Sequence, residues 1–147
     1  MAVTAAPTRA RHVPAAADWA AAVRLAGDLL VDLGVAGPEY GEACVASVRE
    51  RGPYIVLAPG LALAHARPEE GATGTGVVLV RLGEPVVFGH PANDPVDLVL
   101  AFATADAEAH LDVLRALATA LGAGLAADLR AARADDLADL LAGAVTR

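Results

Sequence analysis

One stretch of the chain, residues 96–104 (VDLVLAFAT), constrains the fold more than any other because nearly every position in it is apolar. A strand covered on one face alternates apolar and polar side chains, whereas a strand covered on both faces is apolar throughout. We therefore predict that residues 96–104 form a central strand of a sheet, with helices packed against both faces of that sheet.

The apolar periodicity and the turn residues predict the other elements. The predicted strands are residues 54–58, 61–64, 77–82, 86–88 and 96–104, and the third and fourth are expected to pair through a turn at residues 83–85. The predicted helices are residues 19–33, 39–51, 107–121, 125–132 and 135–145, with Asp18 and Asp106 as N-caps. Since helices precede and follow the strands, the fold class is α/β: a single mixed sheet flanked by helices in three layers.

The domain organisation follows from the same pattern. Residues 1–16 are rich in Ala, Thr and Pro without periodicity, and we predict that they form a flexible N-terminal tail. Residues 17–147 are predicted to form one domain. The apolar stripe of Tyr40, Cys44 and Val48 on the second helix is compatible with internal packing or with a homodimer face.

Composition excludes several classes of protein. The chain of 147 residues has a net charge of −7, which disfavours nucleic-acid binding because that requires clustered Lys and Arg. Its single cysteine, Cys44, excludes an internal disulfide and a cysteine-based metal cluster. No apolar run reaches the roughly 18 residues of a membrane helix, and residues 1–16 lack the apolar core of a signal peptide. We expect a cytoplasmic protein that meets a membrane only as a peripheral partner.

His65 is the first candidate for chemistry, because it lies where an apolar segment ends at a polar turn. Its neighbours Ala64 and Ala66 are small and leave the ring accessible to a partner. Arg67, two residues along an extended segment, emerges on the same side and provides a guanidinium suited to phosphoryl groups. Asp94, in a polar loop, either caps a turn or holds that loop near His65.

His110 is the second candidate. With Asp106 as N-cap, His110 lies in the first turn of its helix, near exposed N–H groups and the positive end of the helix dipole. This position favours a neutral imidazole and attracts anions, although His110 could equally line the edge of the core. Together the two histidines predict a phosphoryl-carrier site in which His65 attacks and His110 holds the phosphoryl oxygens.

Competing constellations are weaker. A zinc site built from His65, His90 and His110 lacks the short spacing of paired ligands, so no metal is expected. The segment 74–76 (GTG) resembles a glycine loop but lacks the lysine and the helix of a P-loop. We therefore expect no metal or organic cofactor.

Three separated motifs carry a family resemblance. They read GPYIVLAPGLALAHARPEEG, GVVLVRLGEPVVFGHPANDPVDLVLAFATAD and HLDVLRALA, in this order. They resemble the type 2 IIA domains of the bacterial phosphotransferase system, the mannitol/fructose class, and are most similar to the ascorbate/galactitol-type subgroup. The resemblance covers roughly residues 40–121.

This resemblance implies a fold and a phosphotransferase activity. The family has a single mixed sheet flanked by helices, and its phosphorylated histidine corresponds to His65, its second active-site histidine to His110. The implied role is to accept phosphate from the histidine phosphocarrier protein and pass it to a IIB component. A IIC membrane permease would then import a sugar, with ascorbate as the subgroup expectation.

The sequence departs from the family pattern at two places. Ala64 stands where the family usually has proline, and the place of a helical active-site arginine falls near Ser47, so neither Arg49 nor Arg51 is assigned. Two other functions stay open at this point. One is a regulatory protein whose phosphorylated His65 controls binding to a target protein, and the other is a binding domain with a decayed site.

Overall fold

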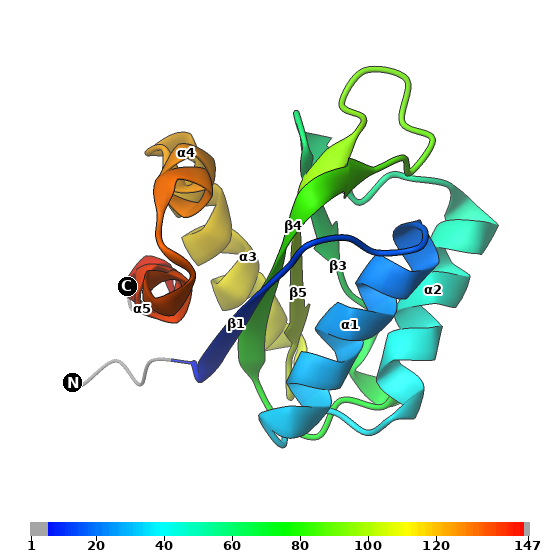
Figure 1. Ribbon diagram of the computed structural model, residues 1–147. Coiled ribbons are helices and arrows are strands. Elements are labelled where there is room, and N and C mark those ends of the chain that lie inside the picture. The colour runs from blue at the N-terminus through cyan, green and yellow to red at the C-terminus, as the bar shows by residue number, and fades with distance from the viewer. Residues whose placement is uncertain (1–5, 146–147) are drawn as a thin grey trace.

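A five-stranded mixed sheet lies between two layers of helices in the computed structural model, which describes residues 6–145 (Figure 1). The strands are β1 (Thr8–Val13), β2 (Val56–Ala58), β3 (Leu61–Ala64), β4 (Gly76–Val86) and β5 (Val96–Ala103). The helices are α1 (Trp19–Asp32), α2 (Glu39–Arg51), α3 (Ala107–Gly122), α4 (Leu125–Ala131) and α5 (Leu137–Ala144), with short 3-10 turns at Pro68–Glu70 and Ala134–Asp136. The strand order is β1-β4-β5-β3-β2. The predicted α/β fold is confirmed.

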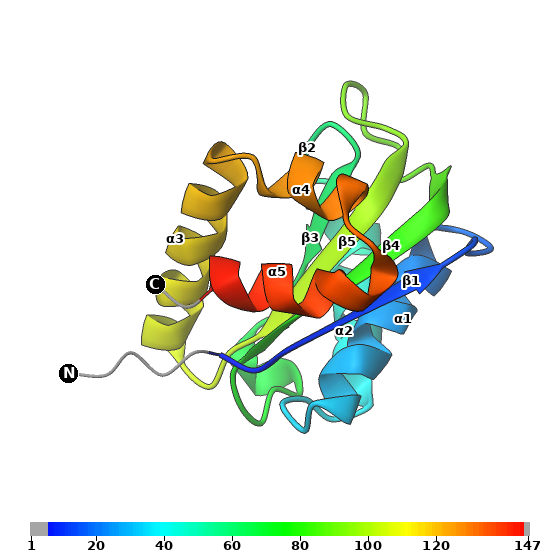
Figure 2. The same cartoon turned by 60° about the vertical axis from the view of Figure 1, so that its left-hand side comes forward.

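β5 is the central strand, as its sequence predicts. It pairs antiparallel with β4 and parallel with β3, and all of its residues except Asp97 are buried. The two faces belong to different clusters: Val99 and Ala101 pack on the side of α1 and α2, whereas Leu100 and Phe102 pack on the side of α3, α4 and α5. Figure 2 shows α3, α4 and α5 together on one face of the sheet.

The predicted N-terminal tail is wrong for residues 8–13, which form the edge strand β1, parallel to β4 from Thr8 opposite Val77 to Val13 opposite Leu82. Main-chain hydrogen bonds hold this strand, and Val13 is its only buried side chain. An edge strand with mostly exposed side chains carries no apolar alternation for a sequence pattern to detect. Residues 1–5 lie outside the described residues.

The predicted hairpin at residues 83–85 is also wrong, because β4 runs without a break through this segment from Gly76 to Val86. The Gly83 Cα passes close to the chain leaving β1: a Cβ there would lie 2.8 Å from the Pro14 carbonyl oxygen, and the Glu84 N–H donates to that oxygen. The glycine therefore serves a close approach of two segments. The true reversal lies between β4 and β5, where Val86 pairs with Val96.

The apolar stripe of α2 packs inside the chain. Tyr40, Cys44 and Val48 are all buried in the core between α1, α2 and the sheet, so this stripe provides no dimer face. Within residues 6–145, no helix has the length and apolar character needed to cross a membrane.

Candidate active site

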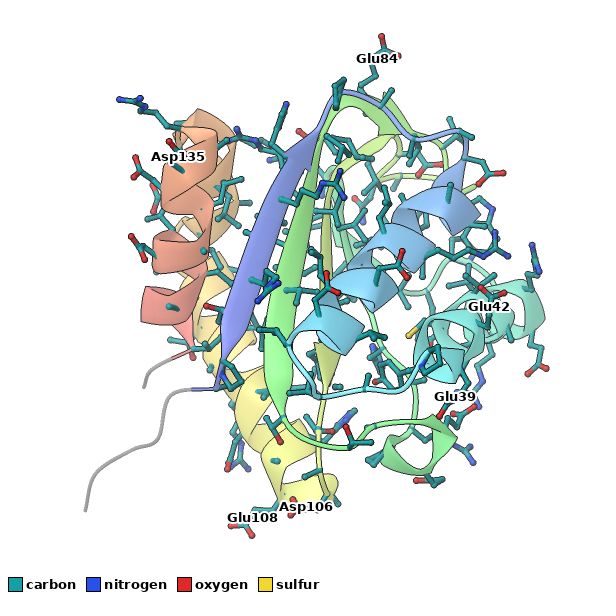
Figure 3. The ribbon with its side chains drawn as sticks, turned by 60° about the horizontal axis from the view of Figure 1, so that its bottom comes forward. Glu39, Glu42, Glu84, Asp106, Glu108 and Asp135 are labelled. Atoms are coloured by element: carbon teal, nitrogen blue, oxygen red, sulfur yellow. The ribbon has the colours of Figure 1, made fainter. Side chains whose placement is uncertain are left out.

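Two strands bring the candidate histidines together. β3 runs parallel to β5, so their carboxyl ends meet at one edge of the sheet. His65 is the first residue after β3, and α3, which carries His110, begins shortly after β5. The two ring centroids lie 5.7 Å apart with an interplanar angle of 65°. Figure 3 shows Asp106 and Glu108 at this edge and Glu84 at the opposite end of the molecule.

A single buried ring supports both imidazoles. The His65 ring stacks on Phe102 at a centroid distance of 5.1 Å and an angle of 14°, and the His110 ring meets Phe102 edge-on at 5.1 Å. Phe102 has no exposed surface, because its side chain packs under α3 within the core. Such aromatic contacts favour a defined relative orientation of the rings. Both imidazoles are therefore held against a rigid part of the sheet.

The His65 ring is set in one tautomer. Its Nδ1 lies 3.1 Å from the Leu63 carbonyl oxygen, and since a carbonyl only accepts, Nδ1 carries the proton and Nε2 keeps a free lone pair. Burial lowers the pKa of His65, and the nearby His110 and Arg51 lower it further, against the opposing effect of the Leu63 hydrogen bond. The ring is therefore a neutral nucleophile near pH 7.

The first turn of α3 places His110. The Asp106 side chain accepts from the Ala109 N–H at 2.8 Å, which confirms Asp106 as the N-cap, and the His110 N–H donates to the Asp106 carbonyl. His110 Nδ1 lies 3.4 Å from the hydroxyl oxygen of the buried Thr104. The imidazole thus stands at the positive end of the helix with a hydroxyl partner at Nδ1.

A cavity of about 790 Å³ opens in front of the two histidines. Two arginines line it, Arg51 from the end of α2 and Arg67 from the turn after β3. Four carboxylates line it as well: Glu50, Glu69, Glu70 and Asp106. The two guanidinium groups and the positive end of α3 provide the donors that a phosphoryl group requires. The site is therefore equipped to bind an anion beside a neutral imidazole.

Arg51 is the site residue that the sequence analysis left unassigned. Gly52, with φ of +85°, ends α2 directly after Arg51. The chain then continues into β2 and β3, and His65 directly follows β3. Arg49 takes no part in the cavity, because its guanidinium lies over the Trp19 ring at 5.8 Å. The signal for Arg51 was its position at a glycine helix end, immediately before the strand pair that leads to the nucleophile.

The full sequence matches the family described as "Phosphoenolpyruvate-dependent sugar phosphotransferase system, EIIA 2" over residues 9–142. The chain belongs to this family. The family resemblance drawn from the three motifs is therefore confirmed, and the match begins within β1, the strand that the sequence pattern did not reveal.

Individual relatives agree with this assignment of the EIIA domain. The ascorbate-specific PTS system EIIA component of Shigella boydii is 48% identical over 95 residues, which cover 65% of this chain and 62% of that protein. The chain thus spans less than two thirds of the length of this curated relative. The solved structure of the mannitol-specific cryptic enzyme IIA CmtB from Escherichia coli is 34% identical with a TM-score of 0.76, covering 94% of this chain and 92% of that one.

A further solved structure of the family contains a complex. It is enzyme IIAMtl with phosphorylated enzyme IIBMtl from Escherichia coli, 27% identical to this chain with a TM-score of 0.68, covering 93% of this chain and 92% of the matched one. The EIIA domain described here therefore shares its fold with structures that include a carrier bound to its partner.

Of the two roles predicted for Asp94, support of His65 is wrong in this EIIA domain. Its carboxylate accepts from the backbone N–H groups of Phe88, Gly89 and His90, which closes the loop between β4 and β5. This loop precedes β5, whereas His65 follows the parallel strand β3. Asp94 therefore lies at the amino ends of these two strands and His65 at their carboxyl ends. The turn-capping alternative is correct.

The remaining histidines lie elsewhere. His90 Nδ1 accepts from the N–H groups of Ala92 and Asn93 in that same distant loop, and His12 on β1 accepts from Arg81. The zinc set of His65, His90 and His110 is therefore not assembled. Among residues 6–145, no group of three or more His, Cys, Asp or Glu side chains is placed to hold a metal ion.

Proposed function

We propose that this EIIA domain is a phosphoryl carrier in which His65 Nε2 accepts the phosphoryl group and His110 contacts its oxygens. The observation that carries the proposal is the neutral His65 ring, with Nδ1 bound to the Leu63 carbonyl and its other nitrogen free. The neighbouring His110 ring, 5.7 Å away, and the arginine-lined cavity supply the surroundings of an anion. Arg67 and Arg51 are proposed as supporting residues.

The proposed step moves the phosphoryl group between two imidazoles. The lone pair on His65 Nε2 forms a bond to phosphorus while the phosphorus–nitrogen bond of a donor phosphohistidine breaks, and the bonding electrons return to the donor ring. The phosphorylated His65 ring keeps its Nδ1 proton and is a cation, which the Leu63 carbonyl and the attached phosphoryl dianion stabilise. No other reactant is required, and the reverse step has the same balance.

The surrounding groups act by placement and charge. A phosphoryl group in transfer spreads negative charge over its equatorial oxygens, so catalysis depends mainly on orientation and on donors to these oxygens. His110 and the first turn of α3 are proposed to face the oxygens from one side, with Arg51 and Arg67 at the rim. Phe102 holds both rings at fixed angles, so little reorganisation is needed.

The proposed donor is the histidine phosphocarrier protein and the proposed acceptor a IIB component, which in turn serves a IIC membrane permease. Support for the acceptor comes from the related IIAMtl structure with phosphorylated IIBMtl. The ascorbate-specific relatives favour ascorbate or a similar acidic sugar as the transported compound. The same proposal places the domain in the cytoplasm.

The test is phosphorylation of the purified chain by phosphoenolpyruvate, enzyme I and the histidine phosphocarrier protein, followed by intact mass measurement. Wild type is expected to gain one acid-labile phosphoryl group, and His65→Gln none. His90→Gln is the matched control because His90 lies at the opposite edge of the sheet, and it should be phosphorylated like wild type. Phosphorylation of His65→Gln, or none of wild type, would reject the proposal.

The acceptor is tested by adding purified IIB proteins to the phosphorylated chain. We expect faster loss of phosphate to a IIB protein of the ascorbate system than to one of the mannitol system. Equal rates would reject the assignment to ascorbate while leaving the carrier function intact.

A further inference from the structure

The buried hydroxyl of Tyr40 joins the two segments that hold His65. The Ala66 N–H donates to this hydroxyl at 3.0 Å, and the hydroxyl lies within donating distance of the carbonyl oxygens of Phe102 at 2.9 Å and Ala66 at 3.1 Å. Ala66 directly follows the nucleophile, and Phe102 carries the ring on which that nucleophile stacks. One side chain of α2 therefore forms hydrogen bonds both to the backbone that follows His65 and to the backbone of Phe102, on which the His65 ring stacks.

The segment after His65 has lost its strand partner. The pairing of β3 with β5 ends where Ala64 lies opposite Ala101, and Ala66 is nevertheless buried. Buried backbone N–H and C=O groups require partners, and Tyr40 provides them for Ala66. The backbone of His65 is thus held by the sheet on one side and by Tyr40 on the other.

We infer that Tyr40 is a positioning residue for phosphoryl transfer: its hydroxyl fixes the backbone that carries His65, so that Nε2 keeps its direction toward the phosphoryl donor. This inference rests on the proposed function of His65. Tyr40 is only 1% exposed, so its hydroxyl does not contact the substrate. It acts only through the backbone segment to which it is hydrogen-bonded.

The electrostatics of Tyr40 agree with this role. Burial raises the pKa of its phenol above the ordinary value, so the hydroxyl stays protonated and remains a donor throughout the working pH range. Its single proton serves two carbonyl oxygens, and its oxygen accepts one N–H. A phenylalanine at this position would keep the packing of the ring but leave these three backbone groups without the hydroxyl.

The test compares Tyr40→Phe with Val45→Ala. Val45 is buried in the same helix and outside the cavity, so its truncation lowers stability without touching the hydroxyl cluster. For Tyr40→Phe we expect the phosphorylation rate at saturating phosphocarrier protein to fall about tenfold or more, because small displacements of a reacting atom are costly. The donor concentration at half-maximal rate should stay within about twofold of wild type. Val45→Ala should keep the wild-type rate.

A second readout follows the His65 ring without any phosphorylation. In nitrogen-15 NMR spectra, wild type should show one Nδ1–H tautomer for His65, and Tyr40→Phe a mixture of tautomers. A wild-type rate with a single tautomer in Tyr40→Phe would overturn the inference. So would equal slowing of both variants in proportion to their lost stability, since that result belongs to a purely structural tyrosine.

Two results separate failure of this inference from failure of the proposed function. If wild type is never phosphorylated, the carrier function fails, yet the tautomer comparison still decides whether Tyr40 positions His65. If Tyr40→Phe does not fold, amide hydrogen exchange of wild type decides instead. An Ala66 amide protected as strongly as those of β5 would support the inference, and fast exchange of this amide would overturn it.

Discussion

The hydroxyl oxygen of Thr104, the buried residue that directly follows β5, lies 3.4 Å from Nδ1 of His110. When the Thr104 hydroxyl donates to Nδ1, the ring N–H lies on Nε2, from which it can donate to a phosphoryl oxygen. The end of the central strand and the residue after it therefore support both histidines. The Phe102 ring contacts both imidazoles, and Thr104 contacts that of His110.

This arrangement predicts distinct effects for the two histidines. His110→Ala should slow phosphorylation of His65 by about 10²-fold, as loss of one preorganised donor does, while intact mass still reaches one phosphoryl group at long times. His90→Ala is the control of equal chemistry outside the site and should react like wild type. A wild-type rate for His110→Ala in both directions of transfer would show that His110 does not hold the oxygens.

The pH dependence of the site follows from the lowered pKa of His65, whose ordinary value is 6.5. The folded protein takes up this proton only at a pH below 6.5, so an NMR titration of the His65 ring should have its midpoint below that value. In the unfolded chain the imidazole of His65 has its ordinary pKa of 6.5. His65 therefore lowers the free energy of unfolding as the pH falls from 6.5 through the folded pKa, and this loss should be absent in His65→Gln. A midpoint at or above 6.5 would contradict the prediction.

The arginines of α2 provide a matched pair for testing charge in the cavity. Arg51 lines the cavity, whereas Arg49, two residues earlier, lies over the Trp19 ring. Arg51→Gln should reduce the rate of phosphoryl transfer by about tenfold, because it removes a cation that faces the phosphoryl group. Arg49→Gln changes the net charge equally and should leave the rate within about twofold. Equal losses in the two variants would indicate a general effect of charge instead of a specific contact.

Exposed apolar side chains near the cavity predict where protein partners dock. Leu111, next to His110, is 47% exposed, and Tyr54, whose ring centroid lies 6.3 Å from that of His65, is 41% exposed. Leu111→Asp should raise the KM for the phosphocarrier protein by about tenfold with little change in kcat, since it places a charge in the interface and leaves the reacting groups intact.

The control for docking is Val87→Asp. Val87 is 67% exposed and lies in the loop after β4, at the opposite edge of the sheet from His65. This variant should bind the phosphocarrier protein like wild type in steady-state assays. An unchanged KM for Leu111→Asp, or equal increases in both variants, would show that the partner binds elsewhere.

Local patterns were sufficient for the elements that lead into the site. The continuous apolar run of β5 predicted a central strand, and Asp18 and Asp106 predicted helix starts that their 2.8 Å hydrogen bonds to Ala21 and Ala109 confirm. The candidate histidines were predictable for the same reason. His65 lies at the end of a short apolar run and His110 in a capped first turn, and both features depend on neighbours in the sequence.

Asp94 is a residue for which the local sequence left two roles open. A carboxylate in a polar loop suits a turn cap as well as a site, and only the parallel pairing of β3 with β5 puts that loop at the edge away from His65. Arg51 is the opposite case, because nothing in its own helix distinguishes it from Arg49 until the chain turns at Gly52.

The sequence by itself determined the central strand and the flanking helices, and it proposed the two histidines as candidates, because periodicity and capping act between residues that are close along the chain. Only the tertiary structure decided that β1 joins the sheet, that the two imidazoles share the Phe102 ring, and that the Tyr40 hydroxyl holds the segment after His65. These contacts join residues far apart in sequence, and they form because buried backbone groups and rings must find partners once the sheet has brought the segments together.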